Sequence, residues 1–162
     1  MKYDDKGNEI EFSDYNSFGQ LNTKCLYKYD NNDNQIESNF YNSDGNLNFK
    51  CGYNYDSNRN QIETFNYDSN GNLNSKWETK YDKRGHQIEC NYLNSTGIVT
   101  SKWTMKYDEN NNKIEYSNNF VRNTVETRTY KYDYDKNKNW KRQIIFRNGI
   151  PLFIIEREIE YY

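Results

Sequence analysis

The sequence lacks alanine altogether and contains a single proline, Pro151, and a single histidine, His86. Alanine is the best helix former, so a chain of 162 residues without it is a poor candidate for a helical bundle or a doubly wound α/β fold. The abundant residues, 17 tyrosines and 28 asparagines, favour strands and turns instead. We therefore expect one all-β domain that spans residues 1–162.

Neither sign of charge dominates, because 24 acidic and 22 basic side chains leave a formal charge of −2. Such a chain has no strong field to attract polyanions, so we expect no nucleic-acid partner. No apolar run approaches the ~20 residues of a membrane-spanning helix, so we expect no membrane insertion. The first residues carry no apolar segment of a secretion signal, and the sequence leaves the cellular compartment of the protein undetermined.

Aliphatic side chains are scarce too, and a mean hydropathy of −1.32 would suit a disordered tail. A repeat of 26 residues argues against disorder, because a fixed internal period is typical of folded repeat proteins. Its landmarks are Tyr-Asp at residues 3, 29, 55, 81 and 107, Ile-Glu at 10, 36, 62, 88 and 114, glycine at 19, 45, 71 and 97, and a basic residue at 24, 50, 76, 102 and 128. Asn123 and Gly149 stand in phase with the glycines. The units begin near residues 3, 29, 55, 81, 107 and 133.

Each unit contains two strands separated by tight turns. The turns have the forms Asp-x-x-[Gly/Asn/Asp]-Asn and x-x-Gly-x, whose residues tolerate positive φ and bond their own backbone. In residues 76–81, Trp77, Thr79 and Tyr81 share one face and charged side chains share the other. This alternation predicts a half-solvated antiparallel strand.

In the second strand of a unit, from Ile36 to about Tyr41, the same alternation places Ile36, Ser38 and Phe40 on one face. At ~13 residues per strand and turn, we expect an antiparallel meander of about twelve strands, built from six 26-residue two-strand repeats. Because so large an aromatic face must be covered, we expect the sheet to curl into an open shell or barrel-like sheet with Tyr, Trp, Phe and Ile inside.

The two ends of the chain differ. Residues 139–162 depart from the repeat and contain the densest aliphatic stretch, which we interpret as a C-terminal cap. The strand that starts the chain has no covering element, so we expect weak self-association through the N-terminal edge strand.

The recurring units Tyr-Asp-x-x-Gly-Asn-x-Ile-Glu and Tyr-x-x-x-Gly-x-Leu resemble the tyrosine-aspartate (YD) repeats of Rhs-type proteins, in the Asn- and Tyr-rich variety common in Bacteroidetes-like bacteria. The resemblance covers nearly the whole chain. It implies long β-sheet ribbons that spiral into hollow shells, usually on secreted or cell-surface proteins and often around a toxin domain. A weaker similarity is to MORN-type hairpin repeats, which share the tyrosine and glycine positions.

Side chains suited to catalysis are few. His86 occupies a turn position that asparagine fills in other units, which is typical of a variable surface residue. Cys25 and Cys51 should lie two strands apart, roughly 9.5 Å at the usual strand spacing, which is too far for a disulfide. Cys90 lies on the other strand of its unit, and we interpret all three cysteines as free thiols. We expect no catalytic residues and no cofactor, and therefore no enzyme.

Two sets of carboxylates recur with the repeat. Turns of the form Asp-x-Asn-x-Asn, such as the one at Asp30, have the first three ligand positions of a calcium loop but lack its closing glutamate, so we favour Asx-type turns over a metal site. The glutamates of the Ile-Glu pairs face a row of basic residues on the neighbouring strand. We expect them to form a solvated ladder of cross-strand pairs.

Regular rows of aromatic side chains are the candidate binding feature. Tyr and Trp rings combine an apolar face with a polar tip and so can stack on sugars or grip a peptide, although we favour a role in the core. The candidate binding residues are Tyr27, Tyr53, Trp77 and Trp103. The sequence predicts a non-enzymatic structural or protein-interaction module whose partner is a protein or a surface glycan, with a carbohydrate-binding protein as the alternative.

Overall fold

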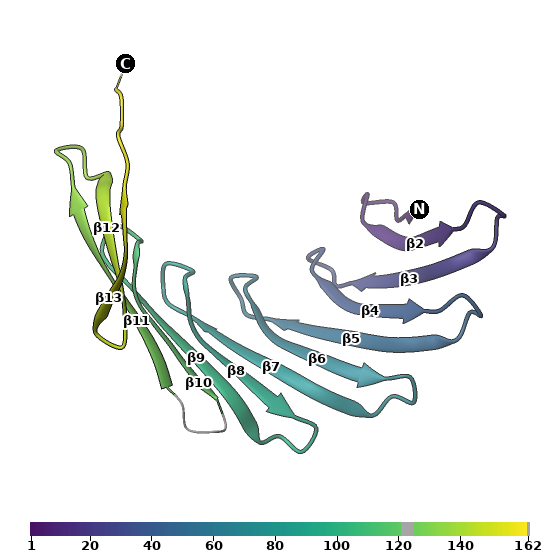
Figure 1. Ribbon diagram of the computed structural model, residues 1–162. Helices are drawn as coiled ribbons and strands as arrows, with labels where there is room; N and C mark the ends of the chain where they lie inside the picture. Colours follow the sequence, from purple (N-terminus) through teal and green to yellow (C-terminus); the bar gives the residue numbers. More distant parts are fainter. Residues whose placement is uncertain (121–124, 162) are drawn as a thin grey trace. The chain divides into compact units, whose positions relative to one another are not determined.

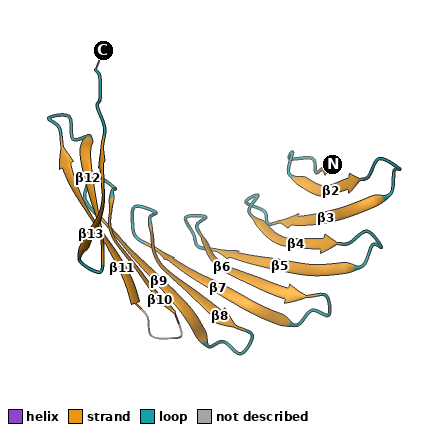
Figure 2. Ribbon diagram, in the orientation of Figure 1, coloured by secondary structure: helices purple, strands orange, loops and turns teal. Residues whose placement is uncertain are grey.

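The structure is a computed structural model, and it describes residues 1–120 and 125–161. Asn123, which the repeat places at a turn, lies outside these residues. The described chain forms thirteen strands that pair in chain order as one antiparallel meander (Figures 1 and 2). β1 and β13 are the two edges of a sheet that does not close on itself. The expected all-β meander is therefore confirmed.

Odd-numbered and even-numbered strands correspond to the two strand positions of the repeat. The odd-numbered strands are β1 Lys2–Tyr3, β3 Leu21–Tyr29, β5 Leu47–Tyr55, β7 Leu73–Tyr81, β9 Val99–Tyr107, β11 Val125–Tyr134 and β13 Ile150–Glu156. The even-numbered strands are β2 Glu9–Tyr15, β4 Gln35–Tyr41, β6 Gln61–Asp68, β8 Gln87–Asn94, β10 Lys113–Phe120 and β12 Trp140–Arg147. Over the described residues, no helix is long and apolar enough to cross a membrane.

The chain consists of two compact units, which we describe separately. Unit 1 comprises Met1–Thr79 and Tyr92–Val99, and unit 2 comprises Lys80–Asn91 and Thr100–Tyr162. Unit 1 therefore holds β1 to β6 with most of β7, and unit 2 holds β10 to β13 with most of β9.

A β-bulge recurs where each strand leaves a Tyr-Asp turn. The pairing of β3 with β4 skips Ile36, which is an extra residue on β4, and Ile10 and Ile62 are skipped in the same way. Gln35 and Ser38, three residues apart, both lie opposite tyrosines on one face of β3. Strict alternation is therefore interrupted between them, because the bulge shifts the side-chain period by one residue.

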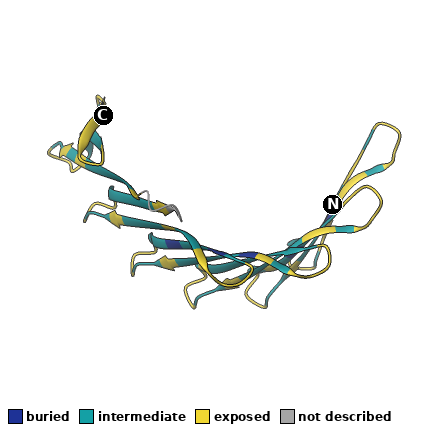
Figure 3. Cartoon of the chain, turned by 60° about the horizontal axis from the view of Figure 1, so that its bottom comes forward, coloured by how far each residue is buried: buried dark blue, intermediate teal, exposed yellow. Residues whose placement is uncertain are grey.

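The sheet has little interior (Figure 3). Over the described residues, the buried apolar side chains are Cys25, Cys90 and Leu93, and the buried polar ones are Ser38 and Ser75. The expected core of aromatic and isoleucine side chains is therefore wrong, because all described strands belong to one layer and no second layer covers the rings within either unit. The rings instead pack against neighbours on the same face, as two stacked phenylalanines 4.2 Å apart show.

The last hairpin differs from the others. A two-residue turn, Asn148-Gly149, joins β12 to β13, and both of its residues have positive φ, 50° and 82°. Such an Asn-Gly pair is the usual choice for the tightest hairpin connection. Every side chain of β13 is exposed. The interpretation of residues 139–162 as a cap stays a prediction.

Candidate functional site

The aspartate of each Tyr-Asp turn closes its own turn. Asp30 Oδ1 accepts the backbone N–H groups of Asn32 and Asn34 at 2.8 and 2.9 Å, and Asp30 Oδ2 accepts Asn34 Nδ2 at 2.9 Å. These bonds, the Asn34 side chain first, lower the pKa of Asp30. The carboxylates thus serve the Asx-type turns that we favoured. In the described parts of the chain, no three His, Cys, Asp or Glu side chains are grouped so that they could hold a metal ion.

The fourth residue of each of these turns has a left-handed backbone. Glycine occupies this position in two turns, at Gly7 and Gly85, but Arg59 and Lys138 adopt the same conformation with φ of 66° and 63°. The sequence pattern anticipated only glycine, asparagine or aspartate here. A long side chain in this conformation stores strain, because its Cβ crowds the following carbonyl.

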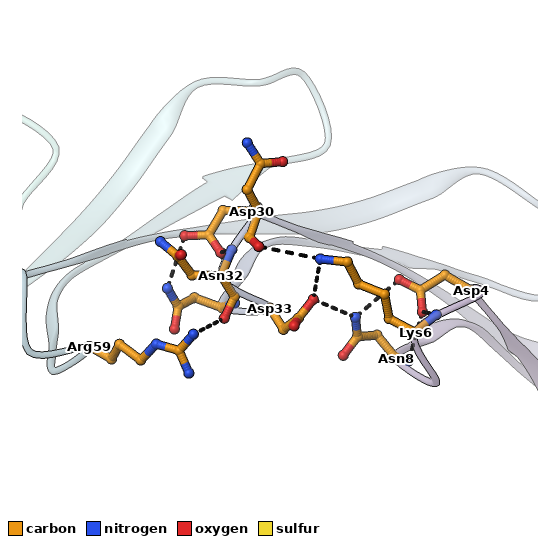
Figure 4. A network of polar contacts seen from close by, with 9 residues as sticks. Asp4, Lys6, Asn8, Asp30, Asn32, Asp33 and Arg59 are labelled. Atoms are coloured by element: carbon orange, nitrogen blue, oxygen red, sulfur yellow. Dashed lines mark hydrogen bonds and ion pairs between the residues drawn. The ribbon is translucent and has the colours of Figure 1, made fainter.

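Neighbouring turns of unit 1 are tied into a polar row (Figure 4). Lys6 Nζ donates to Asp33 Oδ1 at 2.8 Å and to the Asn31 carbonyl at 3.3 Å, and Arg59 Nη2 donates to the Asn32 carbonyl at 2.6 Å. These basic side chains bridge from the first and the third turn onto the second. Contacts this exposed stabilise the chain only slightly.

Hydrogen bonds from several tyrosine hydroxyls connect a repeat to the preceding one. In unit 1, the hydroxyls of Tyr29 and Tyr55 each donate to a backbone carbonyl 20 residues earlier, at 2.9 and 2.7 Å. In unit 2, Tyr132 donates to the Lys113 carbonyl at 2.8 Å, and Tyr134 and Tyr161 donate to the turn aspartate of the preceding repeat. This role of Tyr161 was not predicted, although its spacing of 27 residues from Tyr134 indicates an equivalent position in the next repeat.

The predicted ladder of ion pairs is confirmed. Glu37 Oε1 lies 2.8 Å from Lys28 Nζ, and Glu37 Oε2 lies 2.6 Å from Lys50 Nζ. In unit 2, Glu89 lies between two lysines in the same way, at 2.9 and 2.7 Å. Partial burial alone would raise the pKa of Glu37, but the hydrogen bonds from the lysines lower it to about 2. The lysine on the preceding strand, such as Lys28, is a partner that we did not expect.

The last repeat reverses the signs of this ladder. Arg142 on β12 occupies the register position that glutamate holds in the other even-numbered strands. Asp133 on β11 and Glu156 on β13 lie on either side of it, at 3.9 and 3.4 Å. The three-charge arrangement is kept, but its acidic members now lie on the odd-numbered strands.

His86 is packed more firmly than a variable surface residue. Its ring stacks on Tyr107 with centroids 4.6 Å apart, and its Nδ1 lies 3.1 Å from Asp82 Oδ2. The backbone N–H of His86 also donates to Asp82, which lowers the pKa of that carboxyl to about 2. This histidine is therefore part of a turn.

The three cysteines are free thiols, and Cys25 and Cys51 lie on the face that carries Tyr27 and Tyr53. Cys25 on β3 and Cys51 on β5 are separated by β4, as the repeat predicted. Burial raises the pKa of the Cys51 thiol, whose Sγ lies 3.4 Å from Asn66 Oδ1. A raised pKa disfavours the thiolate that nucleophilic chemistry needs.

Three of the four candidate binding residues lie together on one face of unit 1, which we call the aromatic face. Tyr27 lies opposite Ser38, whose Oγ is 3.1 Å from the Tyr53 hydroxyl. Tyr53 in turn lies opposite Thr64, and Thr64 lies opposite Trp77. Residues paired directly across strands share a face, so small side chains alternate here with rings.

The aromatic face is partly open to solvent. The rings of Tyr27, Tyr53 and Trp77 are all half-buried, and burial raises the pKa of Tyr27 to about 12. Trp77 also packs on Tyr92, with ring centroids 4.7 Å apart. The fourth candidate, Trp103, lies on β9 in unit 2.

Two hollows in unit 1 are lined by equivalent positions of successive repeats. Tyr27 and Tyr29 line the first, of about 340 Å³, and Tyr53 and Tyr55 line the second, of about 530 Å³. The first hollow also contains three turn aspartates and the second contains two, each hollow contains two bulge isoleucines, and the hollows share Asp30 and Ile36. Tyr27 and Tyr53 were expected to lie in rows, but the hollows between the turns were not predicted.

The comparisons with known proteins show weak structural likenesses. No family model matches the chain, and no curated protein matches it. One similar solved structure is the Tc holotoxin pore of Photorhabdus luminescens, with 15% identity and a TM-score of 0.47 over 90% of this chain. Another is the TcdB2–TccC3 complex without its hypervariable C-terminal region, with 15% identity and a TM-score of 0.43 over 86% of this chain. The chain spans 9% of the length of either toxin chain.

A third similar structure aligns over nearly the full length of both chains. A porin-like protein from Bacteroides uniformis is 11% identical, with a TM-score of 0.34, over 89% of this chain and 87% of that chain. At these TM-scores the resemblance to YD repeats stays a prediction from the motifs.

Proposed function

We propose that this chain is a non-enzymatic repeat module that holds an extended sheet and presents it to a partner, either another protein or a surface glycan. The repetition of the polar contacts carries this proposal. Glu37 and Glu89 each lie between two lysines, and the turn aspartates bond their own backbone. The carboxylates suited to acid–base chemistry are thus used alike in successive repeats, whereas a catalytic site needs one differentiated set of groups.

The aromatic face supports the presenting role. Tyr53 and Trp77 offer large, half-buried rings, and no second layer covers them within unit 1. Rings of this kind contribute much contact area at little cost in conformational entropy, which is why tyrosine and tryptophan are common in interfaces. The opposite face carries the ion ladder and is held in place by its own pairs.

A carbohydrate-binding protein is the second candidate, and the two hollows favour it. Each combines the rings of two tyrosines with turn carboxylates that retain acceptor capacity. A sugar ring has an apolar C–H face for stacking and hydroxyls that donate to carboxylates.

A glycan array and a pull-down, each with two matched variants, separate the candidates. Tyr53→Ala removes a ring from the aromatic face, and Tyr67→Ala removes one beside Lys50 on the opposite face. Glycan binding that Tyr53→Ala abolishes and Tyr67→Ala preserves supports the carbohydrate-binding protein. A negative array, with a protein partner lost only from Tyr53→Ala, supports the protein-interaction module. Turnover of a hydrolase substrate panel by the purified wild-type chain would overturn the non-enzymatic proposal.

A further inference from the structure

The free edge of β13 is the longest run of exposed apolar side chains in the described chain. β13 pairs with β12 on one side, and all seven of its side chains are exposed. Ile150, Phe153 and Ile154 are 71%, 60% and 56% exposed. The edge therefore presents unpaired backbone groups together with apolar side chains on both faces, which is the arrangement that favours addition of another strand.

β13 contains no lysine, although it is an edge strand. The odd-numbered strands of unit 1 bear a lysine, such as Lys24 or Lys50, and lysine is the usual residue that keeps a sheet edge from pairing. The charged residue of β13, Glu156, is engaged by Arg142 at 3.4 Å. Pro151 removes one donor near the turn, which leaves residues 152–156 available for pairing.

We propose that two copies of this chain pair β13 with β13 across a two-fold axis and so extend the sheet. An antiparallel pair of identical strands is self-complementary, as a two-fold contact requires. The proposal concerns an edge of unit 2 and goes beyond the presenting role of the aromatic face of unit 1.

The side chains of β13 select one register for this pairing. Phe153 and Ile155 share one face of the strand, and Ile154 and Glu156 share the other. With Ile154 on the two-fold axis, Phe153 lies opposite Ile155 of the partner subunit, and Glu156 lies opposite Leu152 of the partner subunit. Apolar side chains then meet on both faces, and the two glutamates stay apart. β1, at the N-terminal edge, is a less suitable partner for β13. It carries a charged side chain, Lys2, whose Nζ donates to Glu11 Oε2 at 3.0 Å.

Sedimentation velocity over a wide concentration range tests the assembly. The wild-type chain should show a concentration-dependent dimer, and Ile154→Lys should raise its apparent dissociation constant at least tenfold, because two lysines would then face each other. Ile10→Lys is the matched control, since Ile10 is also exposed but lies on β2 near the N-terminal edge. A wild-type chain that stays monomeric, or a dimer that Ile10→Lys disrupts and Ile154→Lys does not, would overturn the proposal. Unchanged circular dichroism of each variant shows that it is folded.

Cysteine cross-linking tests the register. Residues opposite each other in an antiparallel pair have Cα atoms about 4.5–5.5 Å apart, which is within the reach of a disulfide. Ile154→Cys should therefore give a covalent dimer on mild oxidation. Ile150→Cys is as exposed but lies away from the axis, and it should cross-link at no more than a tenth of that rate. The wild-type chain, with its own three free thiols, sets the background. Equal rates for the two variants, or no dimer from either, would overturn the two-fold pairing.

Discussion

Glu37→Gln tests the ion ladder that runs along one face of unit 1. The substitution keeps the size of the side chain and removes the charge that lies 2.8 Å from Lys28 Nζ and 2.6 Å from Lys50 Nζ. Each lysine belongs to a different neighbouring strand, so the glutamate joins three strands at once. Loss of its charge should therefore lower the free energy of unfolding of the sheet.

The magnitude follows from the pKa of Glu37 and from solvent screening. Partial burial would raise this pKa, but the lysine contacts lower it from 4.5 to about 2. The difference between a pKa of 4.5 and one of about 2 corresponds to about 3.4 kcal/mol, which is an upper limit. The Lys28 side chain is 65% exposed, and pairs this open to water contribute only about 0.2–1 kcal/mol each. We expect Glu37→Gln to lower the free energy of unfolding by about 1–2 kcal/mol at neutral pH.

The effect of this substitution depends on pH in a defined direction. Because the pKa of Glu37 is lower in the folded than in the unfolded chain, its contribution is fully present above about pH 4.5 and is lost as the pH falls towards about 2. Protonated Glu37 resembles glutamine in charge. The free energies of unfolding of wild type and variant should therefore converge as the solution is acidified.

Urea denaturation followed by circular dichroism, repeated from neutral to acidic pH, measures this difference. Glu109→Gln is the matched control, because Glu109 lies exposed in a turn, and we expect it to change the free energy of unfolding by less than about 0.5 kcal/mol. Equal losses for Glu37→Gln and Glu109→Gln, or a Glu37→Gln loss that persists unchanged in acid, would refute the reasoning.

Turns and tyrosine contacts lead to three more expectations, each measured as a change in the free energy of unfolding. Lys138→Gly should raise it by about 1 kcal/mol, because Lys138 holds a φ of 63° that glycine adopts without strain; a lowered value would contradict the turn geometry. Tyr55→Phe should lower it by about 1–2 kcal/mol, because the Gln35 carbonyl loses a 2.7 Å hydrogen bond; a wild-type value would show that water replaces the hydroxyl. Gly45→Val should lower it by about 1 kcal/mol or more, because φ is 78°, and Asn46→Ser should lower it less; equal losses would argue against the positive φ.

The parts of the fold that sequence analysis predicted correctly are local and periodic. A turn of the Asp30 type is closed by contacts within five residues, so its form can be read from the residues themselves. The pairing of Glu37 with Lys50 follows once the hairpins are placed, because the turn sets the register. Neither feature depends on how the rest of the sheet is arranged.

The features that were not predicted are those that a two-residue alternation of side chains does not encode. A bulge changes the alternation by one residue, and the sequence around Ile36 carries no glycine or proline to announce it. The absence of an aromatic core depends on whether a second layer exists, which composition does not determine. Arg59 adopts a left-handed conformation because the turn around it imposes one, against the preference of the residue.

The pairing of tyrosine with aspartate explains how a sheet with so few buried residues holds together. The aspartate acts within its own turn, as at Asp56, and the adjacent tyrosine, Tyr55, reaches the backbone of the preceding repeat. One dipeptide thus joins a local contact to a contact between neighbours. In repeat arrays, stability is approximately a sum of such local and nearest-neighbour contributions. Losses from Tyr55→Phe and from a change in a distant repeat should therefore add, whereas losses from two side chains that bond each other, such as Ser38 and Tyr53, should not.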